Sequence, residues 1–172
     1  MNVSTNMSTS QQDNFHKLNS NWTLYSHLPH DTDWSLKSYQ EITEIDTIEK
    51  GISVIKHIPE RTVQNCMLFI MRNKIKPMWE DTDNRQGGCF SFKVTNAIVA
   101  SVWERLAYTL IGETLFKGDK NSKVNGITIS PKKNFCIIKV WLNTCQYQNP
   151  DFIRVRNLSN QACLFKKHVP EH

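Results

Sequence analysis

Hydrophobic and polar residues alternate along several stretches of this chain, and an alternation of period two is typical of strands with one buried face. The clearest case is residues 88–94, where Phe90, Phe92 and Val94 fall on one side and smaller or polar residues on the other. Similar stretches predict strands at residues 22–28, 36–42, 66–71, 124–130 and 135–142. Because the connections between neighbouring stretches are mostly tight turns, we expect the strands to pair antiparallel.

Other stretches carry apolar residues at helical spacing. A first helix is expected to start at Asp46, with Glu49 as its capping-box partner and Ile48, Ile52 and Ile55 on one side. A glycine inside this helix, at position 51, costs about 1 kcal/mol relative to alanine, so that packing must hold the turn in place.

Two further helices are expected downstream. One spans about residues 96–111, with Gly112 at its C-terminal cap and one apolar stripe, formed by Val99, Val102, Trp103, Leu106 and Leu110. The other is expected over residues 150–165, with Asn149 as cap and Pro150 in the first turn. The predicted fold class is therefore α+β, an antiparallel sheet with about three helices packed on one face.

Composition bounds the class of protein. The 172 residues predict one domain over residues 15–172, preceded by a polar tail, residues 1–14, that we expect to be disordered. No apolar run approaches the ~20 residues that span a bilayer, and no secretory signal is visible. The five cysteines lack Cys-x-x-Cys spacing, which favours reduced thiols in a cytoplasmic protein without a metal site. The net charge of +5 permits an RNA partner without requiring one.

The most informative motif is Trp79-Glu80, which lies in the segment Lys76-Pro77-Met78-Trp79-Glu80-Asp81 and is followed by Gly87-Gly88. Pro77 and the two glycines keep this segment outside regular structure. An indole ring offers a flat face on which a nucleobase can stack, and a neighbouring carboxylate can accept two N–H bonds from a guanine edge. The pair is therefore a candidate site for reading one base of a single strand.

Several motifs, in order, resemble the eukaryotic translation initiation factor 4E family, whose members bind the 5′ cap of mRNA. They are Trp22-Thr23-Leu24-Tyr25, Trp34, Ile45-Asp46-Thr47-Ile48-Glu49, Pro77-Met78-Trp79-Glu80-Asp81 with Gly87-Gly88, Leu110-Ile111-Gly112-Glu113, and Gly126 with Trp141. The resemblance runs from about residue 16 to residue 141. It implies a curved sheet that binds the cap on its concave side and packs its helices on the convex side.

The resemblance also implies a site. Trp34 and Trp79 would stack on the two faces of 7-methylguanine, and Glu80 would accept from the guanine edge, while Trp141 would pack near the methyl group. A cationic base between two indoles gains cation–π energy, which distinguishes it from unmethylated guanine. Trp22 and Trp103 correspond to packing residues of the family.

The phosphate-binding positions depart from the family pattern. The first phosphate-binding arginine of the family falls on Lys132, and the second basic position falls on Ile137. A further family arginine, after the double glycine, is replaced by Cys89. Lys139 shares a strand face with Trp141, and Lys133 lies in the same predicted turn as Lys132. We therefore expect Lys132, Lys133 and Lys139 to bind the triphosphate, as point charges and not as bidentate forks.

The helices would carry the partner surface that the family uses to bind a helical scaffold protein of the initiation factor 4G type. Here the corresponding residues are Ile48, Ile52, Glu104, Arg105 and Tyr108. Arg105 places a positive charge where the family has a negative one, so that we expect a scaffold partner with altered charge.

The expected function is cap binding that recruits capped mRNA to translation initiation, without catalysis, cofactor or membrane. No nucleophile–base–orienter set can be assembled from the motifs. Two alternatives remain: a cap-binding translational repressor, and a small-molecule carrier with an aromatic sheet pocket. The carrier would leave Glu80 and the lysines without a role. The many Asn, Lys and Ile residues would also suit a viral copy from an AT-rich genome.

Overall fold

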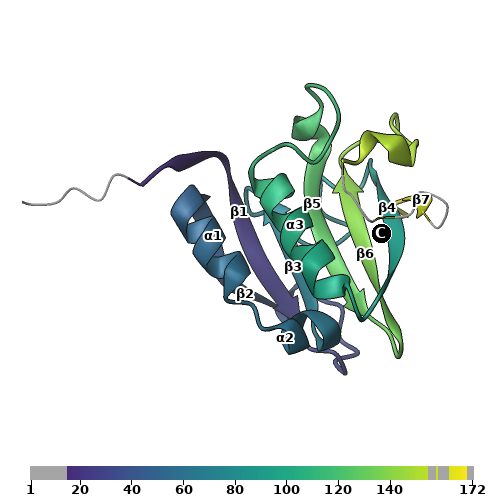
Figure 1. Ribbon diagram of the computed structural model, residues 1–172. Coiled ribbons are helices and arrows are strands. Elements are labelled where there is room, and N and C mark those ends of the chain that lie inside the picture. Colours follow the sequence, from purple (N-terminus) through teal and green to yellow (C-terminus); the bar gives the residue numbers. More distant parts are fainter. Residues whose placement is uncertain (1–14, 155–157, 159–162, 170–172) are drawn as a thin grey trace, which may run out of the picture.

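The computed structural model describes residues 15–154, 158 and 163–169. Within them, seven strands form one antiparallel sheet in the order β2-β1-β3-β5-β6-β4-β7 (Figure 1). The strands are β1 (Lys17–His27), β2 (Tyr39–Thr47), β3 (Met67–Arg72), β4 (Gly88–Thr95), β5 (Val124–Pro131), β6 (Phe135–Leu142) and β7 (Cys163–Lys167). The helices are α1 (Ile48–Lys56), α2 (Glu60–Asn65) and α3 (Val99–Ile111), with short 3₁₀ turns at Leu36–Ser38, Asn121–Lys123 and Pro150–Phe152.

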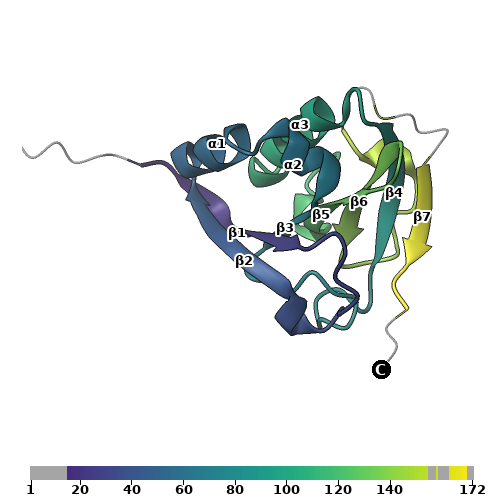
Figure 2. The same ribbon diagram turned by 90° about the horizontal axis from the view of Figure 1, so that it is seen from below.

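The sheet is curved, and α1, α2 and α3 cover its convex face together (Figure 2). Alternation along the strands assigns side chains to the two faces. On β3, Leu68 and Ile70 belong to the main core beneath the helices, whereas Phe69 and Met71 belong to a second apolar cluster with Trp141. This second cluster lies on the face that the helices leave open, where the loops that contain residues 28–38 and 73–87 gather (Figure 2).

The structure confirms the predicted α+β class and the six predicted strands, with ends shifted by a few residues. Trp22 and Trp103 are fully buried in the main core, as expected. The short helix α2 was not predicted. No helix among the described residues is long and apolar enough to cross a membrane. The predicted polar tail, residues 1–14, lies outside the described residues.

The predicted helix over residues 150–165 is wrong. Residues 150–152 form only a 3₁₀ turn, and residues 163–167 form strand β7, which pairs with β4 at the sheet edge. Along β7, Cys163 and Phe165 turn inward and Leu164 outward, the alternation of a strand. Phe165 packs edge-on against Phe90 of β4, 5.0 Å between ring centroids. This pairing with an available sheet edge outweighs the weak helical spacing of the segment.

Helix α1 begins two residues later than expected. Asp46 is still in β2, and the hydroxyl of Thr47 caps the helix by accepting from the Lys50 N–H. Glu49 instead accepts from the backbone N–H of His16, 3.0 Å away.

The glycine within α1 is explained by a close approach. A Cβ on Gly51 would lie 2.5 Å from the Ile111 Cδ1 of α3 and 3.3 Å from the Ile45 Cγ2 of β2. Gly51 therefore lets α1 pack directly against α3 and the sheet, which offsets its low helix propensity.

Candidate functional site

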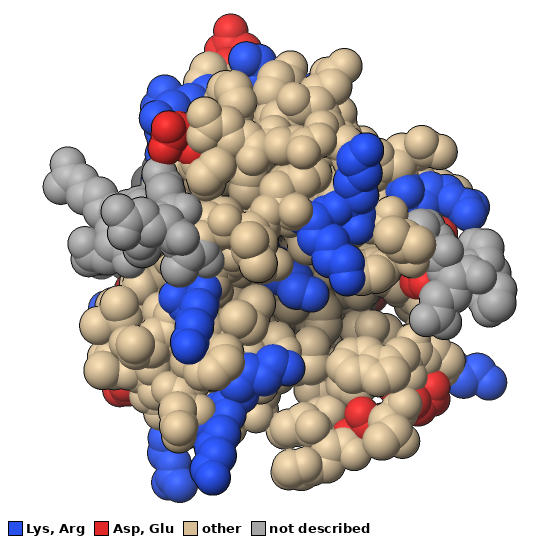
Figure 3. All heavy atoms as spheres, turned by 90° about the vertical axis from the view of Figure 1, so that its right-hand side faces the viewer, with Lys and Arg blue, Asp and Glu red and all other residues tan. Residues whose placement is uncertain are grey.

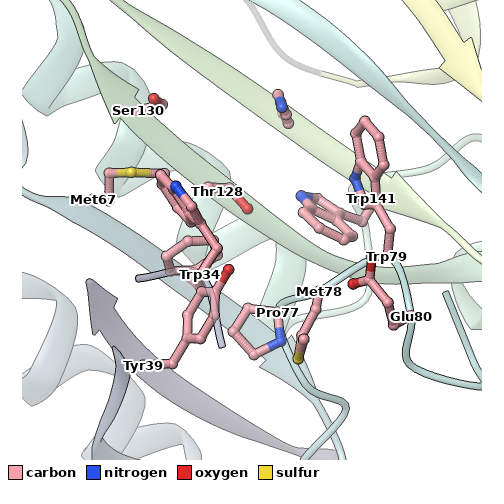
Figure 4. Close-up of a pocket in the computed structure, with 12 residues that line it drawn as sticks. Trp34, Tyr39, Met67, Pro77, Met78, Trp79, Glu80, Thr128, Ser130 and Trp141 are labelled. Carbon is pink, nitrogen blue, oxygen red and sulfur yellow. The ribbon is translucent and has the colours of Figure 1, made fainter. Parts of the chain in front are cut away.

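A cavity of about 630 Å³ opens on the concave face of the sheet. Its described lining comes from β2, β3, β5, β6 and two loops: Trp34, Tyr39, Met67, Phe69, Pro77, Met78, Trp79, Glu80, Thr128, Ser130, Lys139 and Trp141. Figure 4 shows Trp34 on one side of the cavity, Trp79 and Glu80 on the other, and Thr128 and Trp141 between them. The structure thus brings all four residues expected to contact the base, Trp34, Trp79, Glu80 and Trp141, into one cavity.

Trp34 lies at the end of the loop between β1 and β2 and is 53% exposed. The loop is shaped by local side-chain bonds: the Asp31 carboxylate accepts from the Asp33 N–H, and the Asp33 carboxylate accepts from the N–H and hydroxyl of Ser35. The bonds from Ser35 lower the pKa of Asp33. One face of the Trp34 indole stacks on the imidazole of His27, with 4.3 Å between centroids and 4° between planes.

Trp79 and Glu80 lie on a loop between β3 and β4 that is held by buried Asn84. The Asn84 side-chain amide donates to the carbonyl oxygens of Lys76 and Met78, both at 2.8 Å, and its oxygen accepts from Asn125 of β5. Because these bonds span residues on both sides of Pro77, they keep the loop folded against the sheet. This arrangement presents Trp79 to the cavity without regular secondary structure.

The Trp79 indole is backed by the imidazole of His168, with 5.6 Å between ring centroids and 18° between planes. His168 is 6% exposed, and its Nδ1 lies 2.7 Å from the carbonyl oxygen of Asn84. Burial lowers the pKa of His168, and the nearby Lys139 charge adds to this, so that the neutral ring is favoured. The Nε2 of this ring is buried and has no hydrogen-bond partner among the residues that the structure describes.

The floor of the cavity is formed where β5 and β6 pair. Gly126 and Trp141 are cross-strand partners, and a Cβ on Gly126 would lie 2.3 Å from the carbonyl oxygen of Ile70. A larger residue would therefore force β3 and β5 apart beneath the indole. Trp141 is 4% exposed. Within the described part of the chain, neither its buried Nε1 nor the buried Thr128 hydroxyl has a hydrogen-bond partner.

Tyr39 forms the wall beside Trp34 and is a site residue that the sequence reasoning missed. Its ring packs edge-on against Phe69, at 5.4 Å between centroids. Burial raises the pKa of Tyr39 to about 12, and the Glu80 charge contributes to this shift. The cavity therefore places the Glu80 carboxylate near the Tyr39 phenol, which stays neutral.

Lys139 lines the cavity, and its ammonium nitrogen lies 6.0 Å from the centre of a Trp79 ring. Lys166 of β7 lies on the same indole at 5.3 Å. Burial raises the pKa of Cys89, and the charges of Lys139 and Lys166 oppose that shift, which places both cations near the thiol. Lys and Arg side chains gather around a hollow on the face of the molecule that carries β4 and β7 (Figure 3).

The other two expected phosphate-binding residues are not part of the cavity lining. Lys132 and Lys133 are exposed in the turn between β5 and β6, which closes by a bond from the Lys132 N–H to the carbonyl oxygen of Phe135, 2.7 Å long. The structure thus brings Lys139 and Lys166 to the indole and leaves Lys132 and Lys133 at the hairpin tip.

The expected partner surface lies on the opposite, helical side. Ile48 and Ile52 of α1 are 44% and 48% exposed, and Glu104 and Arg105 of α3 are exposed as well. Tyr108 of α3 is half-buried, and its phenol is bonded to Glu104, which helps burial to raise the pKa of Tyr108. We call these five residues the back-face strip.

Three positioning residues were missed from the sequence: His27, Asn84 and His168. The only local signal was the place of Asn84 between Trp79 and the two glycines. Nothing in the sequence links His27 to the Trp34 indole or His168 to the Trp79 indole, because these contacts depend on strand pairing and on the path of the chain after β6.

Comparisons with known proteins agree on one family. A profile of eukaryotic initiation factor 4E matches residues 17–168. The Eremothecium gossypii eukaryotic translation initiation factor 4E is 31% identical over 161 residues, 88% of this chain and 70% of the relative. The factor 4E of Saccharomyces cerevisiae is 31% identical over 133 residues, which are 73% of this chain and 61% of the relative.

Solved structures give the same result for the fold. A Schistosome eIF4E complexed with m7GpppG and 4E-BP superposes with a TM-score of 0.70 at 25% identity, covering 78% of this chain and 75% of that protein. C. elegans eIF4E-3, in complex with the 4E-binding protein Mextli and a cap analog, has a TM-score of 0.70 at 21% identity, covering 80% and 79%. On the match of the family profile to most of its length, this chain belongs to the eukaryotic initiation factor 4E family.

Proposed function

We propose that this chain binds the 7-methylguanosine 5′ cap of mRNA and brings capped messages to translation initiation in the cytoplasm, as a single domain over residues 15–172. The observation that carries the proposal is the pair of indoles, Trp34 and Trp79, on opposite sides of one cavity, with the Glu80 carboxylate beside the second. Its volume of about 630 Å³ suits a ligand of nucleotide size. The solved relatives bound to m7GpppG and to a cap analog support the same ligand.

The chemistry of the cap fits each wall. Methylation at N7 gives the base a delocalised positive charge, and a cation between two indole faces gains about 1–2 kcal/mol when desolvated. The Glu80 carboxylate can accept two N–H bonds from the guanine edge, and its charge strengthens both bonds. A base whose edge lacks these two N–H donors cannot make this contact. Trp141 lines the cavity, and its indole offers apolar surface for the methyl group. A binding role fits this mainly aromatic lining better than a catalytic one.

The triphosphate is assigned to Lys139 and Lys166, with Lys132 and Lys133 further along the path of the RNA. Both cations lie within 6.0 Å of the Trp79 ring, next to the position of Cys89. The phosphate chain of a nucleotide whose base stacks on Trp79 would therefore lie near the ammonium groups of both Lys139 and Lys166. Lysines bind it as point charges, so that the salt dependence of binding should be strong.

For the partner, we propose a helical segment of a scaffold protein on the back-face strip. The exposed Ile48 and Ile52 form an apolar stripe on α1, and two of the similar solved proteins are complexed with a 4E-binding protein. A partner helix can bind such a stripe through apolar side chains that lie one helical turn apart along it. Arg105 is the observation that favours the second candidate, a repressor that occupies the cap without the ordinary scaffold, since a cationic partner motif would meet a like charge.

The deciding experiment is retention on 7-methyl-GTP resin. The full chain should bind and elute with 7-methyl-GTP but not with unmethylated GTP, whereas Trp79→Ala should pass through while keeping its circular dichroism spectrum. A protein that elutes equally with both nucleotides would favour the small-molecule carrier or a general nucleotide binder. Retention of the Trp79→Ala variant would contradict the sandwich.

A further inference from the structure

His27 occupies an unusual place beneath the cavity wall. It is the last residue of β1, is 1% exposed, and pairs with Tyr39 of β2 on one side and Met67 of β3 on the other. Its imidazole lies flat under Trp34, 4.3 Å between centroids and 4° between planes. Trp34 itself is largely exposed on a loop, so that this stack fixes the orientation of an indole whose other face is left to the cavity.

Both ring nitrogens of His27 face backbone carbonyl oxygens. Nδ1 lies 2.9 Å from the oxygen of Leu28, and Nε2 lies 2.8 Å from the oxygen of Asp33. A carbonyl oxygen can only accept, and a neutral imidazole carries one N–H, so that the neutral ring leaves one nitrogen lone pair facing an oxygen. The imidazolium form donates to both. These two carbonyls belong to the first and last residues of the segment 28–33, which the ring therefore closes directly before Trp34.

The charges around His27 suit the cationic ring. Two titratable side chains face it: Asp33 of the same loop, and Tyr39 of the paired strand. The bonds from Ser35 lower the pKa of Asp33, so that its carboxylate stays ionised. Burial raises the pKa of Tyr39 to about 12, so that it stays neutral, and Met67 on the other flanking strand carries no charge.

We infer that His27 is a positioning residue for cap binding: its doubly protonated ring clamps the segment 28–33 and sets the plane in which Trp34 meets the base. The inference rests on the cap-binding function proposed above. A cationic base on the far face of Trp34 would repel the imidazolium. The indole separates the two charges by roughly 8 Å, which weakens the repulsion. The Asp33 carboxylate, which interacts with His27, offsets the charge of the ring.

The inference sets the direction of a pH effect. The clamp is complete when both nitrogens of His27 carry protons and loses one bond when the ring becomes neutral. Its contribution to cap affinity is therefore greatest at the acid end of the range, where the ring holds both protons, and smaller where the ring is neutral. A residue that merely filled space under Trp34 would contribute equally at every pH.

The test compares the full-length wild type with His27→Phe, which keeps a flat ring under Trp34 but has no N–H. Affinity for 7-methyl-GTP is measured by tryptophan fluorescence between about pH 5.5 and 8.5, and any titration of the ligand cancels in the ratio of the two affinities. We expect the wild type to bind about tenfold more tightly at the acid end, the effect of losing one to two hydrogen bonds from a charged donor. The ratio should shrink toward the alkaline end. His30→Gln, an exposed histidine in the same loop, should follow the wild type.

A second measurement needs no substitution. In the wild-type protein labelled with ¹⁵N-histidine, the His27 ring at about pH 6 should give the NMR signature of an imidazolium, with protons on both nitrogens. A wild-type to His27→Phe ratio that stays constant over the pH range, or a neutral ring in the NMR spectrum at that pH, would overturn the inference while leaving cap binding intact. Failure of the wild type to bind 7-methyl-GTP at any pH would instead overturn the proposed function, and the inference with it.

Discussion

At the level of single residues, we propose that the Glu80 carboxylate sets which base edge the cavity accepts. It stands on the same wall as Trp79, on a loop held by buried hydrogen bonds, so that it needs little rearrangement to meet a stacked guanine. Stacking alone does not distinguish one purine from another, because every base has a π face. We therefore expect the choice of base to depend on this carboxylate.

Glu80→Gln should weaken the binding of 7-methyl-GTP by about 1–3 kcal/mol, or roughly 5- to 150-fold, because an amide presents one acceptor and turns an N–H toward a donor. Isothermal titration measures the loss. Tryptophan quenching at saturation should persist, since both indoles remain. An unchanged dissociation constant would show that another group reads the guanine edge.

The two lysines near Trp79 should determine the preference for longer phosphate chains. Lys139→Ala and Lys166→Ala should each reduce the ratio of 7-methyl-GTP to 7-methyl-GMP affinity by several-fold, the order expected for one partly exposed charge pair. Lys132→Ala should reduce it less, since Lys132 is at the exposed hairpin tip. Titrations at two salt concentrations measure both the ratio and its screening. A larger effect from Lys132 would move the clamp to the hairpin.

At the scale of elements, the irregular loop of residues 73–87 is held against the sheet by polar groups that bond inward. Asn84 is fully buried and satisfies two carbonyl oxygens of the loop, and Asp81 accepts from the Lys76 N–H at 2.9 Å. A buried carbonyl that loses its donor costs free energy comparable to its desolvation. The Asn84 amide is therefore a main anchor of the loop that carries Trp79 and Glu80.

Asn84→Ala should lower the free energy of unfolding by about 2–4 kcal/mol, since two carbonyl oxygens and the Asn125 amide lose a partner. Asn84→Asp is the matched variant, equal in size but without an N–H donor, and should lose cap affinity along with stability. Urea unfolding and 7-methyl-GTP titration report the two effects. Full stability of both variants would mean that the loop finds other donors.

Helices α1 and α3 carry the other element-scale prediction, on the back-face strip. Arg105 should select a partner helix with an acidic residue at the facing position and disfavour the family's cationic scaffold motif. A consensus scaffold peptide should therefore bind Arg105→Glu more tightly than the wild type, by fluorescence anisotropy. Tight binding by the wild type that the reversal does not improve would show that this charge does not select the partner.

On the scale of the whole molecule, one sheet separates the aromatic cavity from the back-face strip. The helices bury its convex face, and the concave face is left for the aromatic cavity, so that a cap ligand and a helical partner would bind on opposite sides without competing (Figure 2). The strand β7 completes the sheet beside β4 and leads to His168 behind Trp79. Changes at β7 or His168 should therefore affect both the free energy of unfolding and the position of Trp79 in the cavity wall.

That coupling predicts a pH dependence of stability. Burial lowers the pKa of His168 in the folded protein below its ordinary value of 6.5. At a pH between the folded and the unfolded pKa, the unfolded chain therefore binds more protons than the folded one. The free energy of unfolding should therefore fall as the pH drops below about 6.5. Chemical unfolding over that range should show a smaller slope for His168→Phe than for the wild type, with His30→Gln as control. An identical slope in the variant would assign the acid sensitivity to other groups.

Much of the fold followed from the pattern of the sequence alone. The alternation in residues 88–94 and 135–142 is strong because one face of each strand is packed under helices. The buried Trp22 and Trp103 fall at positions that the family resemblance assigned to packing. Trp79 and Glu80 were also identifiable, since a proline and two glycines isolate them from regular structure. Residues whose environment is set by near neighbours in the chain were thus within reach of the sequence.

Contacts between distant segments were decided only by the tertiary structure. Residues 163–167 pair as a strand because the edge of β4 is available to them, and no local pattern encodes that edge. Lys166 reaches Trp79 through the same pairing, and the stacks of His27 on Trp34 and of His168 on Trp79 need three-dimensional proximity. A spacing of two or 3.6 residues reports which side of an element is buried, but it carries no information on what the buried side meets. The sequence by itself therefore determined most of the elements and the two candidate stacking residues, Trp34 and Trp79, and the tertiary structure decided what holds these two indoles in place.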